Sequence, residues 1–506
     1  MSASRGLSNR AVITVCAMLA TIMQALDTTI ANVALPYMQG NLSATQDQIN
    51  WVLTSYIVAA AIMTPVTGFF AARFGRKRLF LVAVAGFTVS SLLCAMAGSL
   101  EEMVLFRLMQ GVFGASLVPM SQSVLLDSYP KEKHGSAMAI WGMGVMVGPI
   151  LGPTLGGWLT ETYNWRWVFY INLPVGILAF VGLWMALSES KLSKITFDWF
   201  GFLSFSIAIG ALQMMLDRGE QLDWFASSEI IFEATLAGLA AYLFLVHTFT
   251  SKEPFIDPRI FRDRNFTVGV TFIFVVGIIL LATLALLTPY LQNLMGFPVL
   301  TAGLILAPRG MGTMVAMMIV GRAMNRVDPR LFIASGLAMT VWMLWEMTGY
   351  TPDVSQTTLV WQGVVQGLGL GFIFVPLSTV TFATLKPEFR TQGTGLFSLM
   401  RNLGCSIGIS VVGFVLIRST QIVQSDLVQH VTPLNEALRA PGPAHYWNLA
   451  SEAGRAALYS QISHQASTIA YINDFKFMMI VAALAIPLTL VFSGKTSGDK
   501  VEAVLD

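Results

Sequence analysis

The sequence has few charged residues. Only 11% of its 506 residues are Asp, Glu, Lys or Arg, whereas a typical soluble protein has about a quarter. Hydrophobic residues make up 55% of the chain, and apolar runs of about 20 residues, long enough to cross a bilayer as helices, recur along it. These features argue against a soluble protein and predict a multi-pass membrane protein in a lipid bilayer.

Several chemical signatures are also missing. The three cysteines, Cys16, Cys94 and Cys405, lie in apolar runs without the spacing of a disulfide or metal site. The sequence has no phosphate-binding loop and no nucleophile–base set, which argues against nucleotide hydrolysis and against an enzyme. We expect no metal, no cofactor and no nucleic-acid partner. The first apolar run is too long for a signal-peptide core, so we interpret it as a retained span.

Fourteen apolar runs predict an all-α integral membrane protein with fourteen spans. We place them at 12–36, 51–72, 79–98, 102–126, 137–159, 167–187, 199–217, 229–250, 266–290, 300–321, 331–349, 358–384, 393–417 and 475–494. The segments on the side of the N-terminus hold 21 of the 30 Lys and Arg, and the opposite loops hold five. The positive-inside rule therefore predicts that both termini are cytoplasmic.

The longest predicted loop is 418–474, on the outer side. Its two ends have amphipathic helical patterns, and three prolines interrupt its middle. Loops of this length without a role are uncommon. We interpret it either as a lid over helix ends or as a docking surface for an external partner.

Sequence features recur between the two ends of the chain. Gly68 and an Arg five residues later recur after the tenth span as Gly321 and Arg326, and Gln110-Gly111 recurs as Gln366-Gly367. Spans 1–6 therefore match spans 9–14. The predicted domains are a six-helix half at 1–188, two extra helices at 189–265, and a second six-helix half at 266–506. Two similar halves around a central axis are typical of transporters.

Asp27 is the only acid that we place far from a helix end. An ionisable side chain inside a span is costly and points to function. Arg107 in the fourth span stays charged and needs an acceptor. We predict that Asp27 gains and loses a proton during transport with Arg107 as its coupling partner. A structural salt bridge between the two is the alternative.

Other polar residues inside spans are candidates for lining a substrate cavity, although a structural hydrogen-bonding role remains open for Arg309 and Arg401. The candidates are Gln24, Thr28, Asn32, Gln110, Gln122, Arg309, Gln366, Arg401 and Asn402.

The fifth span carries glycines at intervals of four, with two prolines among them. Small residues let a neighbouring helix approach closely, and prolines let a helix bend. We interpret this stretch as a tightly packed seam that also moves; plain helix packing is the alternative. The seam residues are Gly144, Gly148, Pro149, Gly152, Pro153, Gly156 and Gly157.

The short loop after the second span carries four positive charges in six residues. One interpretation is the positive-inside signal alone. The other is a gating loop in which Arg73 or Arg76 pairs with Asp127 and separates from it during the cycle. Its residues are Gly68, Arg73, Gly75, Arg76, Arg78 and Asp127.

Together these stretches resemble the major facilitator superfamily, and within it the fourteen-helix drug:proton antiporter branch, the EmrB/QacA family. The resemblance covers nearly the whole chain. It rests on Leu26 to Pro36, Gly68 to Leu79, Arg107 with Gln110-Gly111, Gly144 to Gly157, Trp165 to Gly176, Leu212 to Trp224, and Arg401 to Gly404. One departure is Ala72, where the branch usually has Asp; the repeat has Asn325 at this position.

The resemblance implies a proton-driven multidrug antiporter that exports hydrophobic or amphipathic toxic compounds across a bacterial inner membrane. The proton gradient would supply the energy. It also implies a tripartite system in which a periplasmic membrane-fusion adaptor and an outer-membrane channel join the pump, and loop 418–474 suits such a partner.

Other interpretations remain open. One is a standalone exporter of a specific metabolite. Another is a proton-coupled uptake symporter, against which the Gly-Pro seam argues. A receptor or assembly subunit would leave the deep acid and the three intramembrane arginines without a purpose.

Overall fold

The computed structural model describes residues 2–189, 196–324, 326–351, 353–432 and 447–492, and within these ranges it contains helices and no strands. The first part of the chain forms α1 (Ser2–Asn41), α2 (Gln46–Ile49), α3 (Trp51–Met63), α4 (Val66–Phe74), α5 (Arg76–Met96), α6 (Leu100–Gly114), α7 (Leu117–Ser128), α8 (His134–Thr162), α9 (Trp167–Tyr170) and α10 (Asn172–Ala186). Two helices follow, α11 (Trp199–Arg218) and α12 (Ser228–Thr250).

The second part forms α13 (Arg264–Pro289), the π-helical η4 (Tyr290–Leu294), α14 (Val299–Ala323), α15 (Pro329–Met347), α16 (Gln356–Ala383), α17 (Arg390–Gln429) and α20 (Glu452–Ala485). Short 3₁₀ turns lie at η1 (Lys131–Lys133), η2 (Trp224–Ala226), η3 (Pro258–Arg262), η5 (Pro387–Phe389) and η6 (Pro487–Val491).

The predicted all-α membrane fold is confirmed. Among the described residues, 12 helices are long and apolar enough to cross a bilayer, and α3 with α4 forms a further span bent by 57°. The bend falls at Pro65, which lacks a backbone N–H and so interrupts the helix. The less apolar α15 occupies the predicted span 331–349; its 19 residues measure roughly 28 Å. The total of fourteen spans stays a prediction.

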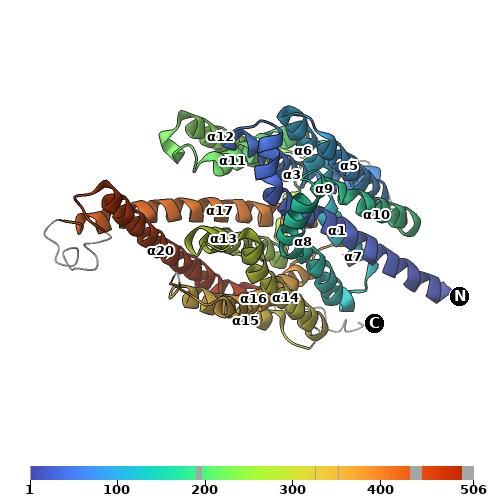
Figure 1. The fold of residues 1–506 in the computed structure, drawn as a ribbon. Helices are drawn as coiled ribbons and strands as arrows, with labels where there is room; N and C mark the ends of the chain where they lie inside the picture. The colour runs from blue at the N-terminus through green and yellow to red at the C-terminus, as the bar shows by residue number, and fades with distance from the viewer. Residues whose placement is uncertain (1, 190–195, 325, 352, 433–446, 493–506) are drawn as a thin grey trace.

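The helices are arranged as two bundles that exchange contacts (Figure 1). In the first bundle α8 packs against α1, and it also packs against α14 of the second bundle. In the second bundle α17 packs against α13, and it also packs against α4 and α7 of the first. The fifth span of each bundle thus contacts the second span of the other, as expected for two similar halves. The limits 1–188, 189–265 and 266–506 stay a prediction.

The two extra helices lie to one side of the bundles (Figure 1). The α11 helix packs against α12, α3 and α17. Many large apolar side chains of α12 are exposed, including Phe232, Tyr242 and Phe249. Such a surface fits contact with lipid acyl chains rather than with water.

The last two spans are longer than the sequence suggested. The 40 residues of α17 measure roughly 60 Å and the 34 of α20 roughly 51 Å, against a hydrocarbon core about 30 Å thick. The extended parts of α17 and α20 pair with each other, and Gln424 donates a hydrogen bond to Ser463 at 3.1 Å. The pair projects from the end of the molecule opposite to the start of α1 (Figure 1). Only residues 430–451 separate them, so the loop predicted at 418–474 is shorter than expected. Its middle, 433–446, lies outside the described residues.

Candidate functional site

The side chain of Asp27 is buried inside the first bundle, with 2% of its surface exposed. Its Oδ2 accepts a hydrogen bond from Arg107 Nη1 at 2.6 Å. Its Oδ1 accepts from Gln110 Nε2 at 2.8 Å and from Asn172 Nδ2 at 3.0 Å. The helices α1, α6 and α10 thus supply one acid and three donors. The three donors, one of them a guanidinium, compensate for the burial of this carboxyl group.

Arg107 has acceptors besides Asp27. Its Nε donates to the carbonyl of Val52 at 3.0 Å, and its Nη1 also donates to Gln110 Oε1 at 2.8 Å. The guanidinium carbon lies 4.4 Å from the centre of the Tyr56 ring, a distance at which the ring face attracts a cation. Arg107 therefore keeps partners if Asp27 becomes protonated. This arrangement permits two charge states without an orphaned buried cation.

Tyr56 connects this cluster to a predicted cavity residue. Its hydroxyl accepts a hydrogen bond from Gln24 Nε2 at 3.2 Å, while its ring lies against the guanidinium of Arg107. Gln24 is half-buried, one turn before Asp27 on α1. A ligand that contacts Gln24 would thus be two side chains away from the ion pair.

The remaining cavity candidates have different local partners, and their shared role in a substrate cavity stays a prediction. Thr28 donates to its own helix backbone at Ala25, and Asn32 is exposed. Gln110 belongs to the Asp27 cluster. Gln122 donates to the sulfur of Met138 at 3.7 Å.

The other candidates lie in the second bundle. Arg309 and Gln366 border a cavity of about 10 Å³, which has room for about one water molecule. Arg309 Nη1 and both polar atoms of the Gln366 amide are buried without a partner among the described residues. Arg401 donates to Asn402 Oδ1, at 3.3 Å from Nη2. Arg309 and Gln366 thus share one small cavity, and Arg401 and Asn402 are hydrogen-bonded to each other.

The glycine seam faces α1. A methyl group at Gly148 would overlap the carbonyl oxygen of Ala25, and one at Gly152 would overlap the hydroxyl of Thr29. Thr29 donates across this contact to the carbonyl of Gly148 at 3.0 Å. The helices α1 and α8 are therefore in backbone contact here, as small residues allow.

The seam is narrower than predicted. Gly144 lies against Met18 and Gly156 lies against Ile30, but Gly157 has nothing within 4 Å of an added methyl group. Pro149 and Pro153 lie inside α8, which continues as one helix from His134 to Thr162. Whether the seam moves stays a prediction.

Three charged side chains meet where the two bundles touch. Asp127 at the end of α7 forms ion pairs with Arg76 at the start of α5 and with Arg390 at the start of α17, the latter at 2.7 Å. Arg390 belongs to the second bundle, so this acid joins the two halves. Arg73 is exposed and Arg78 lies 3.6 Å from Glu189. Sequence reasoning missed Arg390, although it is a basic residue at a helix start.

Two glycines shape the same contact. Gly75 separates α4 from α5 with a φ of 89°, a backbone conformation that favours glycine. A methyl group at Gly68 would lie 2.8 Å from the Cα of Gln392 on α17, so the second span touches the other half here. The predicted role of this loop in gating stays a prediction.

Reversing the charge of Asp127 is expected to loosen this end. In Asp127→Lys three cations would meet at one point, in place of two exposed pairs worth up to about 1 kcal/mol each. The hydroxyl of Ser136 donates to the carbonyl of Gly321 across the two halves. A cysteine introduced there by Ser136→Cys should react severalfold faster with a thiol reagent in Asp127→Lys than in the wild-type background. Drug efflux, the activity that the family resemblance implies, should fall in parallel. The matched control is Glu388→Lys, a charge reversal at an exposed acid. Wild-type efflux in Asp127→Lys would refute the predicted gating role of this loop.

Two further acids are buried, and one of them, Asp474, contradicts the expectation that Asp27 alone lies far from a helix end. Glu233 on α12 is 6% exposed and Asp474 on α20 is 0% exposed. The Glu233 position is near a helix start, but α12 packs along α11, so closeness to the helix end did not give it water contact. Asp474 was placed at the edge of a loop that the structure shows to be helical.

The structure thus has two helical bundles in contact with each other and a buried, hydrogen-bonded acid in the first span. These features are typical of a membrane transport protein. The chain belongs to the Major Facilitator Superfamily, whose family model matches residues 17–409. It is 38% identical over 422 residues to the fatty acid resistance protein FarB of Neisseria gonorrhoeae, with 83% of each chain covered. It is 36% identical over 432 residues to the multidrug export protein EmrB of Escherichia coli, covering 85% of this chain and 84% of that protein.

Solved structures agree on the fold. A bacterial homologue of the human lysosomal transporter Spinster, in an inward-facing and unoccupied conformation, matches with a TM-score of 0.54 over 96% of this chain and 98% of that one, at 18% identity. The human organic anion transporter MFSD10 matches with a TM-score of 0.58 over 94% of this chain and 99% of its own, at 13% identity. At these identities the likeness concerns the fold alone.

Proposed function

We propose that this chain is a proton-driven multidrug exporter of hydrophobic or amphipathic compounds across a bacterial inner membrane. The observation that carries the proposal is the Asp27 cluster, a buried acid whose cation has alternative acceptors. The names of the relatives support the substrate class, since one is a fatty acid resistance protein and another a multidrug export protein.

The cluster suggests how a proton would act. A proton that binds Oδ2 of Asp27 removes the charge that attracts Arg107 Nη1. Arg107 then relies on Val52 and Gln110, which it already contacts. Since Val52 lies on α3 and Gln110 on α6, the new balance of contacts changes how α1 packs on both helices. Asp27 is the proton carrier in this scheme and Arg107 is the switch that reports its charge.

Substrate would enter the scheme through α1. Gln24 on α1 donates a hydrogen bond to the hydroxyl of Tyr56, and the Tyr56 ring contacts the guanidinium of Arg107. Substrate binding and protonation would compete for the same arrangement of α1, so that each inward proton favours release of substrate outside. One charge that crosses 100 mV supplies about 2.3 kcal/mol, or roughly a fiftyfold concentration ratio. No cofactor is needed, because the proton gradient supplies this energy.

The direction of transport tests the proposal. In inverted membrane vesicles with an acidic interior, an exporter takes substrate into the lumen and releases protons from it. We expect an exported dye to accumulate and the pH gradient to fall when the dye is added. A symporter for uptake would leave the dye outside under this gradient, and that result would overturn the proposal. Transport of several unrelated dyes would identify a multidrug pump, whereas transport of one metabolite and of none of the dyes would identify a standalone exporter of a single compound.

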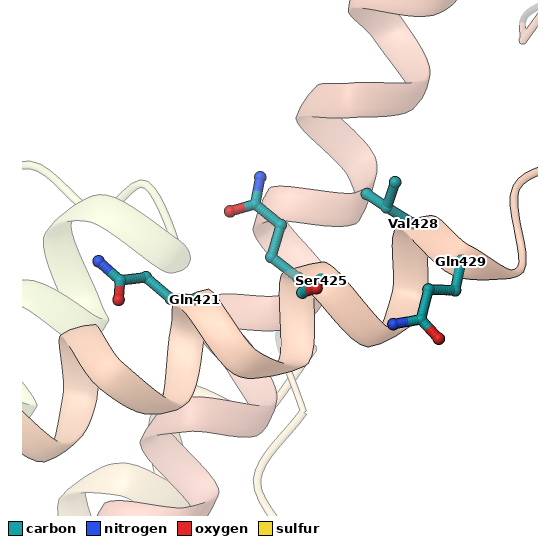
Figure 2. A pocket seen from close by; sticks show the side chains of 5 residues that line it. Gln421, Ser425, Val428 and Gln429 are labelled. Carbon is teal, nitrogen blue, oxygen red and sulfur yellow. The ribbon is translucent and has the colours of Figure 1, made fainter.

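We further propose that the projecting hairpin of α17 and α20 docks the periplasmic adaptor of a tripartite system that ends in an outer-membrane channel. An open hollow of about 430 Å³ lies on it, lined by Gln421, Gln424, Ser425, Val428 and Gln429 (Figure 2). Ile422 is 50% exposed, Val428 47% and Tyr459 62%. Apolar side chains beyond the bilayer, rimmed by amides, are typical of a protein-binding surface.

Substitutions on this hairpin are expected to separate docking from transport. Val428→Asp combined with Ile422→Asp should reduce co-purification of the adaptor at least tenfold, because buried charges at an interface core are costly. Proton-driven dye uptake into inverted vesicles should be unchanged. The control is Val327→Asp, an exposed apolar residue outside the hairpin. Undiminished capture of the adaptor by the double variant, and by a variant that lacks 432–448, would refute the docking surface.

A further inference from the structure

The second bundle contains an acid that the mechanism above does not use. The side chain of Asp474 is fully buried in α20, with 0% exposure. Neither of its carboxyl oxygens has a hydrogen-bond partner among the described residues. Asp27, in contrast, has three donors, one of which is a cation. The two bundles thus hold two buried acids in opposite electrostatic situations.

The surroundings of Asp474 are aromatic and apolar. Tyr471 lies one turn earlier on α20, and its ring centre is 5.3 Å from that of Tyr290 on η4. Phe475, the next residue, packs against Tyr290 and Tyr350. The elements that pack against α20 are α13, α15, α17, η4 and η6. Ionisable residues on or beside these elements include Tyr290 on η4, the half-buried Glu346 at the end of α15, Tyr350 just after it, and the exposed Arg418 on α17; on α20 itself, Lys476 is exposed. The described part of the chain offers no cation that pairs with Asp474.

An ionised carboxylate is not stable in such a place. Isolated charges without donors are among the most costly groups to bury, and a carboxyl group there is expected to take up a proton. A residue that served only to fill space would be better apolar, because replacing buried polar groups by well-packed apolar ones is often stabilising. The presence of an acid without a partner at this position therefore indicates a use for its proton.

We propose that Asp474 is a second proton-binding site, which holds a proton in this conformation and releases it when α20 moves. It lies in the interior of α20, next to the predicted outer start of the last span, so the outer side of the membrane is the nearer source of a proton. Arrival of a proton forms the carboxyl O–H bond, and departure of the same proton leaves the carboxylate. Each bundle would then contribute one proton-binding acid. The role of Asp474 in proton transport rests on the proposed function, whereas its protonation in this conformation does not.

Infrared difference spectroscopy at neutral pH tests the protonation. The spectrum of the wild type minus that of Asp474→Asn should contain the carbonyl stretch of a protonated carboxyl group, with its shift in deuterium oxide. The matched control is Asp27→Asn, whose difference spectrum should show an ionised carboxylate instead. Absence of the protonated band from the Asp474→Asn difference spectrum would overturn the proposal.

Thermal unfolding provides a second measurement. Asn has the shape of a neutral Asp, so Asp474→Asn should unfold at the wild-type temperature or above, whereas loss of a paired carboxylate would lower it. In proteoliposomes, the number of protons moved per substrate should fall by one in Asp474→Asn. An unchanged number would overturn the role in proton transport. Absence of proton coupling in the wild type would instead overturn the proposed function and leave the infrared result standing.

Discussion

Asp27→Asn is expected to abolish proton-driven efflux while the protein still inserts into the membrane. An amide does not ionise at physiological pH and therefore cannot carry a proton across the membrane. The energy of the proton gradient is then no longer available to the pump. The concentration ratio that the pump sustains should fall by about fiftyfold for each uncoupled charge at 100 mV. Cells that carry the variant should become as drug-sensitive as cells without the pump. A drug-susceptibility panel that compares the two proteins at equal expression measures this.

The alternative is that Asp27 only neutralises Arg107. Removing one partner of a buried pair costs about 3–5 kcal/mol, so loss of efflux in Asp27→Asn has a second explanation. The double variant Asp27→Asn with Arg107→Gln also removes the positive charge that Asp27 no longer balances, and it should regain most of the lost thermal stability. If Asp27 carries the proton, this double variant remains inactive. Recovery of efflux together with stability would identify the pair as structural.

Gly148→Ala is expected to have the second large effect. The added methyl group would overlap the Ala25 carbonyl oxygen, which is backbone and cannot turn aside. The helices α1 and α8 must separate, at a cost of about 1–3 kcal/mol for an overpacked contact. Because α8 also packs against α14, the disturbance reaches the contact between the halves. Efflux should fall at least tenfold, measured as dye uptake into inverted vesicles.

Gly157→Ala is the matched control for the seam. It is the same substitution on the same helix, but nothing lies within 4 Å of the added methyl group. We expect wild-type efflux and wild-type thermal stability. Equal losses in the two variants would mean that glycine content, rather than close approach to α1, matters in α8.

The fold was predictable from the sequence because the bilayer imposes one rule on every span. An apolar run of about 20 residues has to be helical, since its backbone finds no other hydrogen-bond partners in lipid. The ends of helices in water follow no such rule. Polar residues such as Gln421 and Gln424 ended the apolar run near 417, but the helix α17 continues to Gln429 because α20 packs beside it. The predicted loop was therefore too long.

The site was predictable in part for a related reason. An acid in the middle of an apolar run is conspicuous, and an Arg in a neighbouring span is its natural partner. Asn172 carries no charge and stands at the start of α10, so nothing in its residue type marked it as a donor to Asp27. The stretch around it did carry family resemblance. Asp474 was missed because its burial comes from α15, α13 and α17 packing around α20, which a single apolar run does not reveal.

The most direct test of proton coupling through Asp27 uses purified protein in proteoliposomes. Two activities are compared: uptake of substrate driven by an imposed pH gradient, and exchange of labelled for unlabelled substrate without a gradient. Wild type should perform both. Asp27→Asn should retain exchange, because α1 still moves, and should lose gradient-driven uptake. Gradient-driven uptake by Asp27→Asn at the wild-type rate would contradict the account.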